Sequence, residues 1–242
     1  MQRNRKLTTE DVALTVCFSA LYTVFCLLPI FQIVGLPSKS ITMAAILAPL
    51  IGILVGPYLG VLSTTLGGAI GLFIGPLSPP GFVSGLVAAF FAGTLYFGKR
   101  SLAAFAYFSL LFLFSFYPFV GPVWLFPPLM WFQIVGFLIL ISPLQSSALK
   151  ILNSNTNNNS GLLFAFFITS LTSTLAGQIG GSFSLEVLAW PIFMADVNAW
   201  KTIWQVTIFL YPIERTIIAV ASALIGTPLL KVLKATKTVT HE

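Results

Sequence analysis

The fold of this chain is decided by residues 40–98, which read SITMAAILAPLIGILVGPYLGVLSTTLGGAIGLFIGPLSPPGFVSGLVAAFFAGTLYFG. This stretch lies between Lys39 and the Lys99-Arg100 pair and contains no Asp, Glu, Lys, Arg or His. Small residues recur in it at every fourth position, in three rows: Ser40, Ala44, Ala48, Gly52, Gly56, Gly60, Thr64, Gly68; Ser63, Gly67, Gly71, Gly75; and Gly81, Gly85, Ala89, Gly93. In water each Gly would weaken a helix by about 1 kcal/mol relative to Ala. In lipid the backbone satisfies its own hydrogen bonds, and such rows let helices approach closely, so the stretch predicts packed membrane helices.

The composition of the whole chain agrees with this interpretation. Of its 242 residues, 57% are hydrophobic and 7% are charged, against roughly 45–50% and 25% in soluble domains. We therefore expect a single all-α, polytopic transmembrane domain over residues 1–242, with the lipid bilayer as its surroundings. The net charge of +6 does not indicate a nucleic-acid partner, because such a partner needs a clustered basic face, and here the basic residues stand in short groups between apolar runs.

Apolar runs bounded by Pro, Gly or charge predict six to eight membrane segments. They fall at about 11–31, 41–56, 58–75, 81–98, 102–118, 124–143, 161–180 and 203–230. A bilayer needs about 20 apolar residues per helix, so the second and third runs are short, and one or both tilt, kink or re-enter. Thr8, with Asp11 three residues later, predicts the start of the first helix.

The basic residues predict the topology, because Lys and Arg between spans favour the cytoplasm. With eight crossings and both termini inside, nine of the twelve basic residues are cytoplasmic. This topology gives cytoplasmic tails at 1–10 and 234–242, a cytoplasmic polar loop at 151–160 and an outside loop at 181–202. The chain is then a multi-pass protein of the plasma membrane.

The order of turns and spans in residues 11–100 resembles a known family. An apolar span is followed by the Gly-Pro-aromatic-x-Gly turn at 56–60, a glycine-rich span, the Pro-Pro-Gly break at 79–81 and the Lys99-Arg100 pair. This layout resembles the S component of energy-coupling factor (ECF) transporters, the membrane subunit that captures vitamins and other micronutrients. S components usually have six spans with both termini inside, so the pair 102–143 is an addition or a differently divided region.

The resemblance also implies partners and a docking face. The partners are a transmembrane coupling subunit and two ABC-type ATPase subunits, and no cofactor is implied. In the family, small residues on one face of the first span contact the coupling subunit, commonly as Ala-x-x-x-Ala. The nearest match here is Ala13-x-x-x-Cys17, with Ala20 on the same face.

Enzyme chemistry has few candidate residues in this chain. The single histidine, His241, lies in the tail, which disfavours a His-assisted nucleophile and a zinc site. Asp11 and Asp196 lie near the ends of spans rather than facing each other in the membrane. We therefore assign no catalytic residue and no metal ligand, and expect that the chain is not an enzyme. An autonomous secondary transporter remains an alternative, although such carriers use ionisable relays, and a packing or assembly subunit of another membrane complex is a second one.

Candidate ligand-binding residues lie in the predicted outside loops. The 181–202 loop carries Trp200 and Asp196, and the first loop carries Lys39. Aromatic rings with a few placed polar groups are typical of a pocket for a flat, heteroaromatic ligand. The alternative for each Trp is an aromatic belt at the membrane interface.

Glu214 and Arg215 are the charged pair inside an apolar run. Pro212 suits the first turn of a helix, so we expect the last span to begin there and to place both charges in the outer part of the membrane. Adjacent side chains point about 100° apart on a helix, so we expect the two not to neutralise each other. One alternative is a structural ion pair with Asp196, Glu186 or Lys201. The other is a ligand site, helped by Trp204 or Gln205 on the preceding turn.

Overall fold

The computed structural model describes residues 8–154 and 158–239 and is about 81% helical. Parts of the two predicted tails and of the predicted polar loop, namely residues 1–7, 155–157 and 240–242, lie outside this description. The described elements are, in order, α1 (Thr9–Cys26), β1 (Pro29–Ile33), β2 (Leu36–Thr42), α2 (Ala44–Val55), α3 (Pro57–Ile74), α4 (Pro79–Tyr96), α5 (Arg100–Ser115), α6 (Pro122–Leu125), the 3₁₀ helix η1 (Pro127–Met130), α7 (Trp131–Ile141), α8 (Pro143–Asn153), α9 (Asn159–Ala189) and α10 (Val197–Val239).

The helices confirm the prediction of an all-α membrane protein. Within the described residues, five are long and apolar enough to cross a membrane: α1, α3, α4, α9 and α10. The stretch from η1 through α7, together with α8, makes a sixth if the pair counts as one span bent by 60°. α2 and α5 are apolar but have only 12 and 16 residues.

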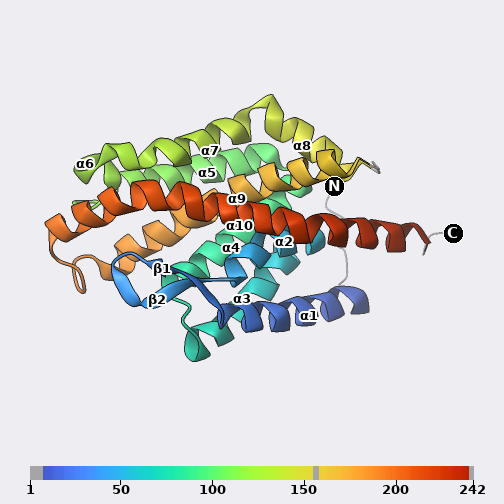
Figure 1. The fold of residues 1–242 in the computed structure, drawn as a ribbon, viewed down its shortest axis with the longest axis horizontal. Coiled ribbons are helices and arrows are strands. Elements are labelled where there is room, and N and C mark those ends of the chain that lie inside the picture. The colour runs from blue at the N-terminus through green and yellow to red at the C-terminus, as the bar shows by residue number, and fades with distance from the viewer. Residues whose placement is uncertain (1–7, 155–157, 240–242) are drawn as a thin grey trace.

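α9 is the central helix of the bundle, and 83% of its most apolar window is buried. Figure 1 shows α9 and α10 running side by side through the middle, with α1 and α3 along one edge and α5 to α8 along the opposite edge. The short β1–β2 hairpin lies beside them, between α1 and α2 in the sequence.

The first apolar run forms one helix and one strand rather than a single span over 11–31. α1 begins as predicted, since the Thr8 side chain accepts from the Asp11 amide and the Asp11 carboxylate accepts from the Thr8 amide. The helix ends at Cys26 because Pro29 cannot donate a backbone hydrogen bond and disfavours helical geometry at the residue before it. Pro29 instead starts β1, which pairs antiparallel with β2, and Gly35 supplies the positive φ of 88° at the turn.

The rows of small residues lie where helices cross backbone to backbone. A Cβ added to Gly52 on α2 would meet the Ala89 carbonyl oxygen of α4 at 2.2 Å. A Cβ added to Gly67 on α3 would meet the Ser19 carbonyl oxygen of α1 at 2.4 Å. The predicted turn between α2 and α3 is also confirmed, with Gly56 at a φ of 92°.

The last two long helices extend beyond their predicted limits. The predicted bounds of the loop at 181–202 are wrong, because α9 continues to Ala189 and α10 begins at Val197. α9 continues through Gly181 because its backbone packs on α4, where an added Cβ would meet the Pro80 carbonyl oxygen at 2.9 Å. The predicted start of the last helix at Pro212 is also wrong, since Pro212 lies inside α10.

Basic side chains gather at one end of the bundle and hold the ends of α7 and α8. Arg100 donates from Nε to the Leu140 carbonyl and from Nη2 to the Ser142 carbonyl, both at 2.8 Å. Lys234 donates to the carbonyls of Leu152 at 2.5 Å and Ser154 at 2.8 Å. Carbonyls at a helix C-terminus have no partner within the helix, so Arg100 satisfies carbonyls at the bend between α7 and α8, and Lys234 satisfies carbonyls at the C-terminal end of α8.

Candidate functional site

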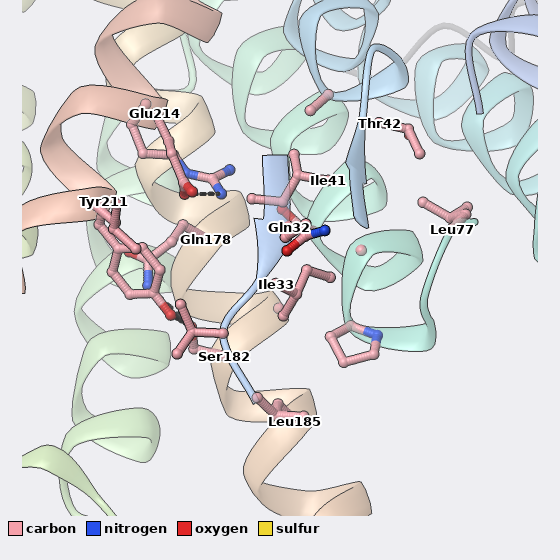
Figure 2. Close-up of a pocket in the computed structure, with 18 of the residues that line it drawn as sticks. Gln32, Ile33, Ile41, Thr42, Leu77, Gln178, Ser182, Leu185, Tyr211 and Glu214 are labelled. Atoms are coloured by element: carbon pink, nitrogen blue, oxygen red, sulfur yellow. Dashed lines mark hydrogen bonds and ion pairs between the residues drawn. The ribbon is translucent and has the colours of Figure 1, made fainter. Parts of the chain in front are cut away.

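A cavity lies between the β1–β2 hairpin, α4, α9 and α10, at the end of the bundle away from the basic cluster (Figures 1 and 2). The cavity itself has a volume of about 80 Å³, and about 760 Å³ is empty when the open space at its mouth is included. Polar groups come mainly from α9 and α10. The hairpin and the starts of α2 and α4 supply mostly apolar and small residues.

The α9 side of the cavity carries a connected hydrogen-bond network. Gln178 and Ser182 are four residues apart, so they share one face of α9. Gln178 donates to the Ser182 hydroxyl at 3.0 Å, and that hydroxyl lies 3.3 Å from the Tyr211 hydroxyl of α10. Gln133 of α7 donates to the other side of Gln178 at 3.0 Å. The network fixes the rotamers of the cavity wall, since each side chain is held by its neighbour (Figure 2).

Glu214 and Arg215 line the cavity from α10 and pair with each other. Arg215 Nη2 lies 3.6 Å from Glu214 Oε2, and each residue is 5% exposed. The expectation that neighbours cannot pair is therefore wrong, because the long arginine side chain bends back to the carboxylate although the two Cβ directions diverge. The pair is incompletely hydrogen-bonded: Glu214 Oε2 and Arg215 Nε have no hydrogen-bond partner within the described part of the chain.

The hairpin forms the facing wall of the cavity. Gln32 of β1 and Thr42 of β2 contribute its polar groups, while Ile33 and Ile41 contribute apolar surface (Figure 2). Thr42 is 2% exposed, and its hydroxyl has no hydrogen-bond partner among the described residues. Leu77, from the connection between α3 and α4, extends the apolar surface.

Five of the residues expected to bind ligand lie away from this cavity. The indoles of Trp200 and Trp204 are fully buried and donate to the carbonyls of Met194 and Val120, each at 2.8 Å. Neither tryptophan is among the described residues that line the cavity, and the same is true of Gln205, Asp196 and Lys39. Gln205 and Asp196 are exposed, and Lys39 is half-buried on β2.

The reason for this placement is that α10 begins 15 residues before Pro212, so Trp200 and Trp204 belong to its first turns and not to a binding loop. Their rings pack on each other and on Phe114 of α5. The structure brings Glu214 and Arg215 together with Gln32, Thr42, Gln178, Ser182 and Tyr211, which were not among the expected site residues. The spacing of Gln178 and Ser182 was the one available signal for this polar face.

Another ionisable group, Glu186, is buried on α9 one turn beyond Ser182. It is 0% exposed, and neither carboxylate oxygen has a hydrogen-bond partner among the described residues. It does not line the cavity. No group of three or more His, Cys, Asp and Glu side chains within the described residues is arranged to hold a metal ion.

The expected docking residues lie on the outer face of α1. Ala13, Cys17 and Ala20 are exposed. The opposite face of the helix packs on α3, with Ser19 9% exposed and Tyr22 1% exposed. These three small residues are therefore open to contact with lipid or another helix, on a helix that also exposes Val12 and Val16.

Comparison of the chain with protein-family models, with curated proteins and with solved structures finds no match. The geometry therefore carries the functional argument. The cavity combines fixed polar groups, lining residues with buried atoms that have no hydrogen-bond partner in the described part of the chain, and an apolar wall, which is an arrangement suited to holding a small molecule.

Proposed function

We propose that this chain is the substrate-capture membrane subunit of an ECF-type ABC importer, and that it binds a vitamin or similar micronutrient in the cavity between the hairpin, α9 and α10. The observation that carries the proposal is that three residues lining the cavity each have a buried polar atom without a hydrogen-bond partner among the described residues, namely Thr42 Oγ1, Glu214 Oε2 and Arg215 Nε. A buried polar atom without a partner costs about 1–3 kcal/mol. A ligand that hydrogen-bonds to these atoms recovers that cost, which favours the bound state.

The proposed topology has eight passes, both termini in the cytoplasm and the cavity opening to the outside of the plasma membrane. Eight passes result when α1, α3, α4, α9 and α10 each count as one, the bent pair from η1 through α8 counts as one, and the shorter α2 and α5 count as one each. α2 is short for a bilayer, but nine of its twelve residues are buried among other helices, so protein and not lipid surrounds its ends. The basic end, with Arg100 and Lys234, then faces the cytoplasm by charge bias.

The proposed energy source is a separate complex, a transmembrane coupling subunit with ABC-type ATPases. The exposed face of α1 that contains Ala13, Cys17 and Ala20 supports this part of the proposal, because small residues let another helix approach closely.

Affinity purification of the tagged chain from its native membrane tests the proposal. We expect ABC-type ATPase subunits and one polytopic coupling subunit to co-purify in fixed ratio. A tagged unrelated membrane protein of the same cell is the control. Recovery of the chain alone, or with partners that include no ATPase, contradicts the proposal.

One observation favours a second candidate, an autonomous proton-coupled carrier. Glu186 is fully buried without a hydrogen-bond partner among the described residues, and ionisable residues inside the membrane often mark proton pathways. A carrier of this kind accumulates its substrate in proteoliposomes that contain only this chain when a pH gradient is imposed. Accumulation that is lost in Glu186→Gln supports the carrier, and absence of accumulation by the wild type excludes it.

A further inference from the structure

The charges of the cavity wall balance each other. Among the described residues that line it, Glu214 is the one acid and Arg215 the one base, and they lie 3.6 Å apart. Lys39, Asp196 and Lys201 lie outside the lining. A ligand with a net charge would therefore bring an uncompensated charge into a site whose own charges are 5% exposed, and burial of an unpaired charge is costly.

The same pair carries two hydrogen-bonding atoms of opposite kind near each other, because the guanidinium that contains Nε approaches Oε2 to 3.6 Å through its Nη2. Glu214 Oε2 accepts and Arg215 Nε donates, and neither has a hydrogen-bond partner within the described part of the chain. A ligand satisfies both only if it carries a donor next to an acceptor. Cyclic amides and amino-substituted nitrogen heterocycles have such an edge, with an N–H beside a carbonyl oxygen or a ring nitrogen.

The opposite side of the cavity is shaped for the body of a ring. Ile33 and Ile41 of the hairpin and Leu185 of α9 are apolar, and Gly81 and Gly181 add lining without side chains. Gln32 and Thr42 lie on this hairpin side (Figure 2). The lining therefore has an apolar part opposite the Glu214–Arg215 pair, with Gln32 and Thr42 as further polar groups on the hairpin side.

We propose that the cavity selects a ring compound without net charge, whose adjacent hydrogen-bond donor and acceptor engage Glu214 and Arg215. This inference rests on the proposed capture function and narrows its substrate to a chemical class. The Glu214–Arg215 pair then acts as a charge-balanced selectivity element, because removal of either charge leaves the other to attract a ligand of opposite sign.

The test uses the purified full-length chain and yeast extract as the source of probes. The extract is separated on ion exchangers at pH 7 into neutral, anionic and cationic fractions, and the thermal unfolding midpoint Tm of the chain is measured with each fraction. A mixture of the free amino acids is a fourth probe, because amino acids are neutral overall but carry two charges. We expect only the neutral fraction to raise the Tm, by about 5 °C for a ligand well above its Kd.

Variants at the pair give the second arm of the test. In Glu214→Gln the Tm response should move from the neutral to the anionic fraction, and in Arg215→Gln it should move to the cationic fraction. The double variant restores zero net charge with polar groups at both positions, so it should respond again to the neutral fraction. The matched control is Lys201→Gln, an exposed substitution on the same helix, which should respond as the wild type does.

Each outcome separates the inference from the function on which it rests. A wild-type Tm raised by the anionic fraction, the cationic fraction or the amino acids would leave the capture function standing and overturn the uncharged ring. A wild-type Tm that no fraction raises would remove the capture function, and the inference with it. Variants that keep the wild-type preference for the neutral fraction would show that the pair does not set the charge of the ligand.

Discussion

A substitution at the α2–α4 crossing tests the packing that positions the cavity. Gly52 of α2 lies against the backbone of α4, and an added Cβ would sit 2.2 Å from the Ala89 carbonyl oxygen and 3.0 Å from the Gly93 amide nitrogen. Both neighbours are backbone atoms of a helix, so neither yields by changing a rotamer. In Gly52→Ala the two helices must separate by about 1 Å before ordinary contact distances return.

The expected cost follows from this separation. Overpacking of a tight site costs about 1–3 kcal/mol, and the higher helix propensity of Ala returns up to about 1 kcal/mol. A net loss of about 1–2 kcal/mol lowers the Tm by about 3–8 °C for a chain of this size. Gly93→Ala, whose Cβ would meet the Pro57 nitrogen at 2.5 Å, should act in the same way. The double variant should lose less than the sum, because the first substitution already opens the crossing.

Scanning fluorimetry of the detergent-purified chain measures these effects, using its five tryptophans. The control is Gly161→Ala near the start of α9, where the nearest atoms belong to the side chain of Asn158, the N-cap residue of the same helix, and not to the backbone of another helix. The reasoning would be refuted if Gly52→Ala and Gly93→Ala left the Tm within about 1 °C of the wild type, or if the control lowered it equally.

Three other predictions concern the basic end of the bundle, the proposed docking face and the proposed topology. Arg100→Ala should lower the Tm by several degrees, since hydrogen bonds from a charged group each contribute about 1.5–3 kcal/mol, whereas Lys99→Ala should have little effect; equal Tm values for the two variants would contradict the capping role. Ala13→Leu combined with Ala20→Leu should abolish co-purification of ATPase subunits while ligand-induced Tm shifts persist; an intact complex would assign docking to another face. In a background without native cysteines, Asp196→Cys should react with an impermeant thiol reagent from outside the cell and Lys99→Cys should not; the opposite pattern would invert the topology.

Features of the fold that depend only on neighbouring residues were predicted correctly from the sequence. The capping pair Thr8 and Asp11, the Gly56-Pro57 turn and the Pro79-Pro80 break act on their immediate neighbours, and the structure has them where they were expected. The hairpin was not predicted, because β1 continues the apolar run of α1 without a change in composition, while the polar residues of β2, such as Lys39, indicated a loop. Only Pro29 marks the boundary, and a single proline does not distinguish a kinked helix from a strand.

Only part of the candidate site was predicted, because some of its residues stand out in the sequence and others depend on how the helices pack. Glu214 and Arg215 are recognisable because charges are rare in apolar runs. Gln178 and Ser182 become cavity residues only because α9 packs centrally and turns that face toward α10, which is a tertiary outcome. The opposite error occurred at Trp200 and Trp204. Aromatic residues among polar ones suggested a binding site, but both side chains are buried in the core of the bundle.

If the cavity between the hairpin, α9 and α10 holds a small nutrient, that compound should remain bound through purification and can be identified. The chain is purified from cells grown in rich medium, and bound small molecules are extracted and quantified by mass spectrometry. Ala45→Trp places a large ring in the cavity, and Ala20→Trp places the same ring on the exposed face of α1; both variants are first shown to be monodisperse and cooperatively folded. We predict one compound at near-equimolar amount in the wild type and in Ala20→Trp, and its loss in Ala45→Trp. The same set of compounds at the same amounts in all three proteins, or none in the wild type, would contradict the account.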